Sequence, residues 1–87
     1  ALADARRYGD RREIGSSLYG LGMADMAEGR LDQAEARYRE AIAIWREEGR
    51  ERQIAFAERA LGRVFETRGQ YAEAVEMQVN ALETMLR

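Results

Sequence analysis

Apolar residues recur every three or four positions along the chain, which is the period of an amphipathic helix. The first such stretch follows Asp10-Arg11-Arg12-Glu13, a segment with the spacing of a capping box. Gly29 follows the stretch and predicts the end of the helix, because glycine adopts the left-handed conformation without strain. The apolar positions of this helix are Ile14, Leu18, Leu21, Met23 and Met26.

The same order of elements continues to the end of the chain. A second helix is predicted from Leu31 or Asp32 to Gly49, then a third over about 52–68, and a fourth from Tyr71 to about Leu86 after a turn at Gly69. Residues 1–8 align with residues 41–48 and predict a further helix before the first. The apolar stripe of the second helix consists of Ala34, Tyr38, Ala41, Ile42 and Trp45.

The chain repeats itself with a period of 40 residues. A shift by 40 positions produces eleven identities in 47 aligned positions. They fall mainly on small residues and helix-ending glycines, which are positions that helix geometry constrains. The sequence therefore predicts a single domain over 1–87, in which 1–8 close a preceding repeat, 10–49 form repeat 1 and 50–87 form repeat 2. Because both ends fall within predicted helices, we expect the sequence to be a piece of a larger protein.

The spacing of these residues resembles the tetratricopeptide repeat. That family places a large apolar residue before Leu-Gly, then a turn glycine, then Ala, an aromatic residue and Ala. The matching positions here are Leu18, Leu21, Gly22, Gly29, Leu31, Ala34, Tyr38 and Ala41, and in the second copy Leu61, Gly62, Phe65, Gly69, Tyr71, Ala74 and Ala81. The resemblance implies an all-α fold, an α-solenoid of antiparallel helix pairs with about two full repeats and a leading half repeat.

Packing explains the small residues in this pattern. Gly22, Ala34 and Ala41 would stand where the two helices of a unit approach closely, with Tyr38 and Leu21 filling the space beside them. The glycines inside the first helix would each cost about 1 kcal/mol relative to alanine.

The chain also departs from the family pattern. The period of 40 exceeds the family's usual period of about 34 residues. It resembles the longer repeats of bacterial signalling ATPases and transcriptional activators. Asp25 and Gln78 stand where the family prefers aromatic residues, and no proline follows the second helix of a unit. These changes predict weaker packing without loss of the fold.

Composition excludes several functions. The sequence has no Cys and no His, so it lacks thiolate ligands, the commonest metal ligand and the commonest general base. All fourteen basic residues are Arg, a bias typical of GC-rich bacterial genomes. No apolar run reaches the length of a membrane span and the net charge is −2, so we expect a cytoplasmic protein that does not bind membranes.

We expect no enzymatic activity, cofactor or metal. Ser16 and Ser17 have no His or Lys to activate their hydroxyls. Asp25 and Glu28 lie one helical turn apart and could share a cation, but a solvated polar patch before the turn is the favoured interpretation. Arg6, Arg7, Arg11 and Arg12 form a basic cluster, yet acidic residues interleave it and no base-stacking aromatic pattern accompanies it, so nucleic acid is not the expected partner.

The resemblance instead implies a protein–protein interaction scaffold. In such a stack the first helix of each unit lines a concave groove, which would bind a peptide or helix with apolar and acidic anchors. Arg binds carboxylates through two hydrogen bonds, and Met surfaces adapt to varied partners. Ser16 occupies one of the groove positions of the first unit, and the predicted groove residues are Tyr19, Met23, Met26, Arg52, Phe56, Arg59, Arg63 and Glu66.

The alternative is a structural role, in which the terminal helices drive self-association and produce a homo-oligomer. The predicted self-association face of the last helix consists of Val75, Val79, Leu82, Met85 and Leu86. In either case we expect a module of a larger bacterial regulatory or assembly protein.

Overall fold

The protein is described by a computed structural model that covers the backbone of residues 11–86 and the side chains of residues 13–86. Over this range it forms four helices, α2 (Arg11–Ala27), α3 (Leu31–Glu48), α4 (Glu51–Thr67) and α5 (Tyr71–Met85), and no strand. The all-α prediction and the four helices after the first turn are confirmed. The predicted helix over 1–8, the capping residue Asp10 and the basic cluster at residues 6–12 lie outside the residues with described side chains.

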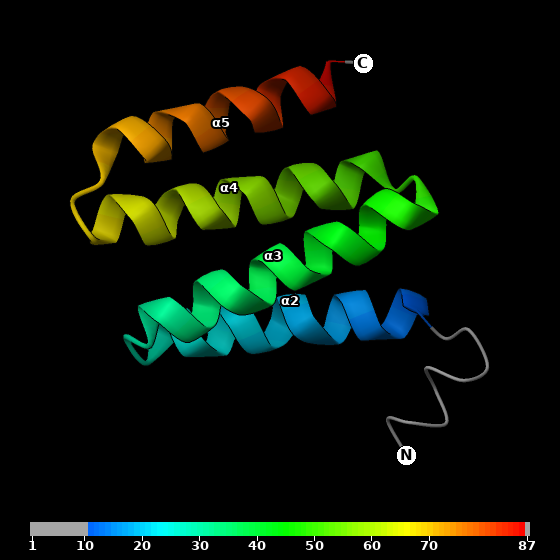
Figure 1. Cartoon of the computed structure of the whole chain (residues 1–87), viewed down its shortest axis with the longest axis horizontal. Helices are drawn as coiled ribbons and strands as arrows, with labels where there is room; N and C mark the ends of the chain where they lie inside the picture. The colour runs from blue at the N-terminus through cyan, green and yellow to red at the C-terminus, as the bar shows by residue number, and fades with distance from the viewer. Residues whose placement is uncertain (1–10, 87) are drawn as a thin grey trace.

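The helices stack in chain order, each antiparallel to the one before it (Figure 1). α2 packs on α3 and α4 packs on α5, which makes two helical hairpins. α3 then packs on α4 and joins the hairpins, whereas α2 touches α4 at few positions. Each helix therefore contacts mainly its neighbours in the chain, as expected of a helical repeat.

Each of the three described turns between helices contains a glycine with the same geometry. Gly29, Gly49 and Gly69 have φ of 80°, 70° and 82°, in the left-handed region that favours glycine. After each glycine, the next backbone N–H donates to the carbonyl five residues earlier: Arg30 to Asp25 at 2.8 Å and Arg50 to Trp45 at 2.9 Å, for example. This is the Schellman arrangement, so the three predicted glycine stops are confirmed.

Two other glycines allow aromatic rings to approach a helix backbone. A Cβ on Gly22 would lie 2.7 Å from the Cε1 atom of Tyr38, and a Cβ on Gly15 would lie 2.6 Å from Nε1 of Trp45. Both rings are buried. The close approach predicted at Gly22 is therefore confirmed, and Gly15 provides a second one for Trp45.

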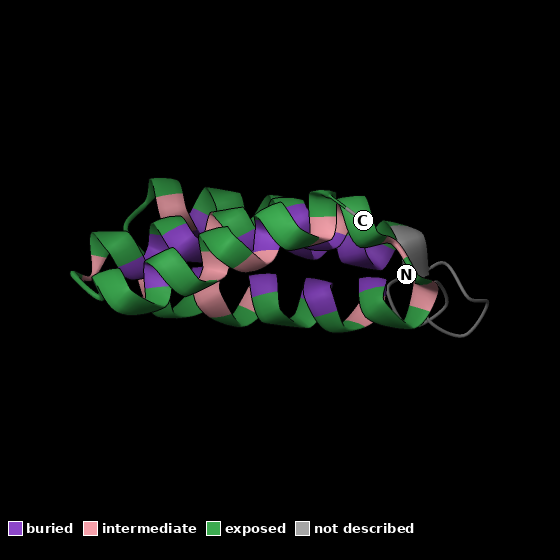
Figure 2. Ribbon diagram, turned by 90° about the horizontal axis from the view of Figure 1, so that it is seen from above, coloured by how far each residue is buried: buried purple, intermediate pink, exposed green. Residues whose placement is uncertain are grey.

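The core lies along the sides on which the helices face one another (Figure 2). It includes Tyr38 and Trp45 of α3 and continues into α4. The predicted packing role of Leu21 is wrong, because its side chain is 48% exposed, whereas the equivalent Leu61 is 2% exposed. The difference arises because α3 covers this side of α4, and no described element covers the same side of α2.

The polar patch predicted at Asp25 and Glu28 is also wrong in part. Asp25 is 5% exposed, and its Oδ2 atom accepts a hydrogen bond of 2.7 Å from Nε of Arg37. Arg30 lies 3.7 Å from the other carboxylate oxygen of Asp25. Glu28 remains half exposed beside Arg30. The carboxylate of Asp25 can thus occupy a buried position where the family prefers an aromatic residue, because Arg37 of α3 supplies its counterion.

Candidate peptide-binding groove

The first helices of the two units, α2 and α4, together line a cavity of about 460 Å³. The helical period places Tyr19, Met23 and Met26 on one face of α2, one turn apart. It likewise places Phe56, Arg59 and Arg63 on one face of α4. These six predicted residues all line the cavity, and its other lining residues, Ala27, Tyr38 and Ala60, were not among the predicted groove residues.

Two of the predicted groove residues do not line this cavity. Arg52 lies exposed in the first turn of α4, and Glu66 lies exposed near its last turn. Both project from the same side of the helix as Phe56, but they stand beyond the two ends of the cavity. The helical wheel places these residues on one face of α4, and the cavity occupies only the middle of that face.

The floor of the cavity is aromatic. The rings of Tyr19 and Tyr38 are 5.6 Å apart and tilted by 50°, a favourable arrangement for aromatic pairs. Burial raises the pKa of Tyr38, and the neighbouring Tyr19 raises it further, while the positive charge of Arg63 acts in the opposite direction. Tyr38 is therefore a neutral hydrogen-bond donor at physiological pH.

The rim of the cavity combines exposed apolar side chains with free positive charge. Met23 and Phe56 are about half exposed. No ion pair joins Arg59 or Arg63 to another residue in the described part of the chain, although most other arginines of α3 and the turns are paired. An apolar surface with two available guanidiniums suits a ligand that has both apolar and acidic side chains.

The predicted self-association face divides into two parts. All five of its residues are exposed, and so is Tyr71, which the sequence analysis left out. Leu82 and Met85, however, line a second cavity of about 500 Å³ together with Arg59 and Arg63. The two surfaces that the sequence suggested as alternatives therefore adjoin along α4.

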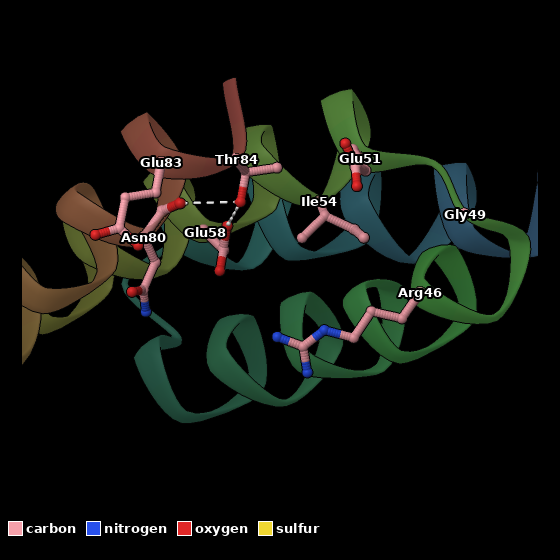
Figure 3. A pocket seen from close by; sticks show the side chains of 8 residues that line it. All are labelled: Arg46, Gly49, Glu51, Ile54, Glu58, Asn80, Glu83 and Thr84. Carbon is pink, nitrogen blue, oxygen red and sulfur yellow. Dashed lines mark hydrogen bonds between the residues drawn. The ribbon is translucent and has the colours of Figure 1, made fainter. Parts of the chain in front are cut away.

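A third cavity, of about 390 Å³, opens on a different side of α4, between α3 and α5 (Figure 3). Sequence reasoning missed it, although Glu58 at a core position of α4 was an available signal. Glu58 is 6% exposed, and its carboxylate lies 3.3 Å from the hydroxyl of Thr84. That hydroxyl has one proton and lies closer, at 2.9 Å, to the backbone carbonyl of Asn80.

Two features are absent from the described part of the chain. No group of three or more potential ligands in it could hold a metal ion. None of its helices combines the length and the apolar character needed to cross a bilayer.

Comparison with known proteins agrees with the repeat geometry. The family model for the tetratricopeptide repeat matches residues 1–87. The chain therefore belongs to the tetratricopeptide repeat family, whose helical hairpins are typically non-catalytic modules for protein interaction. No curated protein and no solved structure matches the chain.

Proposed function

We propose that the chain is a non-catalytic scaffold that binds a peptide or helix in the cavity between α2 and α4. The observation that carries this proposal is that two guanidiniums without an ion pair among the described residues, Arg59 and Arg63, lie beside the exposed side chains of Met23 and Phe56. The apolar side chains provide the burial that stabilises a complex, and the arginines select a ligand with Asp or Glu nearby. The scaffold serves as a module of a larger cytoplasmic bacterial protein with a regulatory or assembly role.

The experiment that tests this proposal is selection from a displayed library of random peptides on the folded chain. We expect the selected peptides to be enriched in large apolar residues and in Asp and Glu. Arg63→Glu should weaken their binding by about tenfold or more, because it replaces an attraction with a repulsion at the cavity. Arg52→Glu is the matched control, since it makes the same charge change on the same helix face outside the cavity.

Circular dichroism should show the same helix content for both variants, because both side chains are exposed. Equal binding by Arg63→Glu and the unchanged chain, with the helices intact, would rule out this groove. Selection of peptides without acidic residues would rule out the proposed role of the arginines.

A second candidate function is self-association through α5, and one observation favours it. In addition to Leu82 and Met85, α5 exposes Val75, Val79 and Leu86, and such apolar patches are typical of interfaces. Light scattering over a wide range of concentration tests it. A dimer that Val79→Glu dissociates would support self-association, and a monomer at every concentration would exclude it.

A further inference from the structure

The cavity between α4 and α5 has a counterpart one repeat earlier. It is lined by Arg59, Arg63, Gln78, Ala81, Leu82 and Met85. A shift of 40 residues turns this set into Tyr19, Met23, Tyr38, Ala41, Ile42 and Trp45. The hairpin α2–α3 thus has an equivalent surface at the same place as the hairpin α4–α5.

In the first unit a helix occupies that surface. α4 packs on α3, and Ile54, Ala57 and Leu61 of α4 belong to the same buried cluster as Ile42 and Trp45. Ile42 and Trp45 are consequently 7% and 3% exposed. We call this surface of a hairpin its helix seat. In the second unit the equivalent Leu82 and Met85 are 59% and 50% exposed, so no described residue covers the second seat.

The two seats differ in charge at one edge. Where the first seat has Tyr19 and Met23, the second has Arg59 and Arg63. In the first seat, α4 places Phe56 and Ala60 around the cavity that these two residues line. A helix on the second seat would bring its equivalents of positions 56 and 60 close to two guanidiniums.

The rest of the second seat is more apolar than the first. In the first seat, Arg39 lies over the ring of Phe65 at 5.8 Å, and Glu35 accepts a hydrogen bond from Arg68. The equivalents of Arg39 and Glu35 in the second seat are Val79 and Val75, both exposed. The incoming helix therefore needs apolar residues along its centre and carboxylates at one edge only.

We propose that the α4–α5 hairpin seats an amphipathic helix of a partner protein, arranged as α4 is arranged on α2–α3, with its apolar face on Val79, Leu82 and Met85 and acidic residues toward Arg59 and Arg63. The existing contact of α4 with the first seat supports the geometry, and charge complementarity supports the acidic edge. This surface shares Arg59 and Arg63 with the α2–α4 groove, but it differs from the groove in Leu82 and Met85, which do not line that cavity.

A second copy of the chain does not fit this seat in a head-to-tail stack. Its α2 would bring Ser16 and Gly20 to the two arginines, because these are the equivalents of Phe56 and Ala60. It would also bring Asp25, the equivalent of Phe65, against Val79. Such a stack leaves both guanidiniums without a carboxylate and places a charged position against an apolar one, which disfavours it.

The probe is a peptide with the sequence of α4, the helix that occupies the first seat. A synthetic peptide with the sequence of residues 51–67 is made in three forms: unchanged, with Phe56→Glu and Ala60→Glu, and with Phe56→Arg and Ala60→Arg. Binding to the whole chain is measured by isothermal titration calorimetry. We expect the acidic peptide to bind about tenfold or more tightly than the unchanged peptide, and the basic peptide to bind more weakly than both. The double variant Arg59→Glu and Arg63→Glu should reverse the order of the acidic and basic peptides.

Variants of the protein locate the bound peptide. Leu82→Glu should abolish binding of the acidic peptide, whereas Gln70→Glu, which adds the same charge in the exposed turn before α5, should leave it unchanged. Equal binding of the three peptides would overturn the inference. So would binding that Met23→Glu abolishes and Leu82→Glu spares, although that result would support the α2–α4 groove. A dimer of the chain that Leu82→Glu dissociates, with no peptide bound, would assign the seat to a second copy and also overturn the inference.

Discussion

Arg68, in the turn after α4, donates a hydrogen bond to the carboxylate of Glu35 near the start of α3. The same guanidinium also bonds to Asp32, one turn earlier on α3. These bonds connect the two repeat units, because Arg68 belongs to the second and Glu35 to the first. The side chains of Arg68 and Glu35 are only 21% and 23% exposed, so water screens the pair less than an exposed ion pair.

Removal of this connection should lower stability in a pH-dependent way. The hydrogen bond from Arg68 lowers the pKa of Glu35 below its ordinary value. A lowered carboxyl pKa stabilises the fold above the unfolded pKa, and this stability is lost as the pH falls through the folded pKa. Arg68→Ala should cost about 1 kcal/mol of unfolding free energy at neutral pH and less below about pH 4.5.

Urea denaturation at neutral and acidic pH measures this effect. Arg52→Ala is the control, because Arg52 is exposed and has no ion pair among the described residues. A cost for Arg68→Ala that stays constant down to pH 3 would show that the charge of Glu35 does not contribute.

Glycine-to-alanine substitutions in α2 should have opposite effects at two positions. Gly20→Ala should stabilise the protein by about 0.5–1 kcal/mol, because alanine favours the helix and a Cβ there meets nothing within 4 Å. Gly22→Ala gains the same helix propensity but places a Cβ 2.7 Å from the buried ring of Tyr38. We therefore expect a net loss of about 1–3 kcal/mol. Thermal denaturation followed by circular dichroism compares the pair, and equal effects would contradict the close packing of Tyr38.

The ion pair of Asp25 and Arg37 should be replaceable by the two apolar residues that stand at the equivalent positions of the second repeat. The equivalents of Asp25 and Arg37 are Phe65 and Met77, and both belong to or pack against the core. Arg37→Met alone removes the hydrogen bond of 2.7 Å to Asp25 and should cost about 2–3 kcal/mol, because it leaves a buried carboxylate poorly compensated.

The double variant Asp25→Phe and Arg37→Met should recover most of that loss. A double-mutant cycle by urea denaturation measures the recovery. Additive losses from the two changes would show that Asp25 and Arg37 contribute independently.

The reverse exchange should stabilise the second repeat. Glu58 and Thr84 occupy the positions of Leu18 and Ile44, which pack in the core of the first repeat. Because the single proton of the Thr84 hydroxyl favours the nearer carbonyl, the buried carboxylate of Glu58 has weak compensation. Glu58→Leu with Thr84→Ile should raise the unfolding free energy by about 1–3 kcal/mol.

The control for this exchange is Glu51→Leu at the exposed edge of the same cavity, which should change stability by less than about 0.5 kcal/mol. A lower stability of the double variant would mean that the Glu58 carboxylate has a stabilising partner in solution.

Most of the fold could be predicted from the sequence, because local rules determine it. The left-handed glycines at 29, 49 and 69 mark the turns, and the spacing of Ala34, Tyr38 and Ala41 marks the buried face of α3. The groove face of α4 followed from helical geometry for the same reason. Six of the eight predicted groove residues line one cavity.

What could not be predicted depends on contacts between elements distant in the sequence. The burial of Asp25 depends on Arg37, which only the packing of α2 on α3 brings near. The exposure of Leu21 depends on which helix covers α2. The joint lining of a second cavity by Arg59 and Leu82 requires the position of α5 relative to α4, which no local pattern encodes.

Only Ala74 and Ala81 of α5 are buried, so among the described side chains this helix has the fewest buried residues of the four. Amide hydrogen exchange should accordingly be fastest in α5, which is the element that forms half of the second seat. A helix bound there would stabilise α5 and, through α4, the α2–α3 hairpin. The stabilisation would increase with the logarithm of the ratio of the helix concentration to its dissociation constant. Partner binding would then control how long the chain survives in a cell as well as what it assembles with, since proteases act on the opened form.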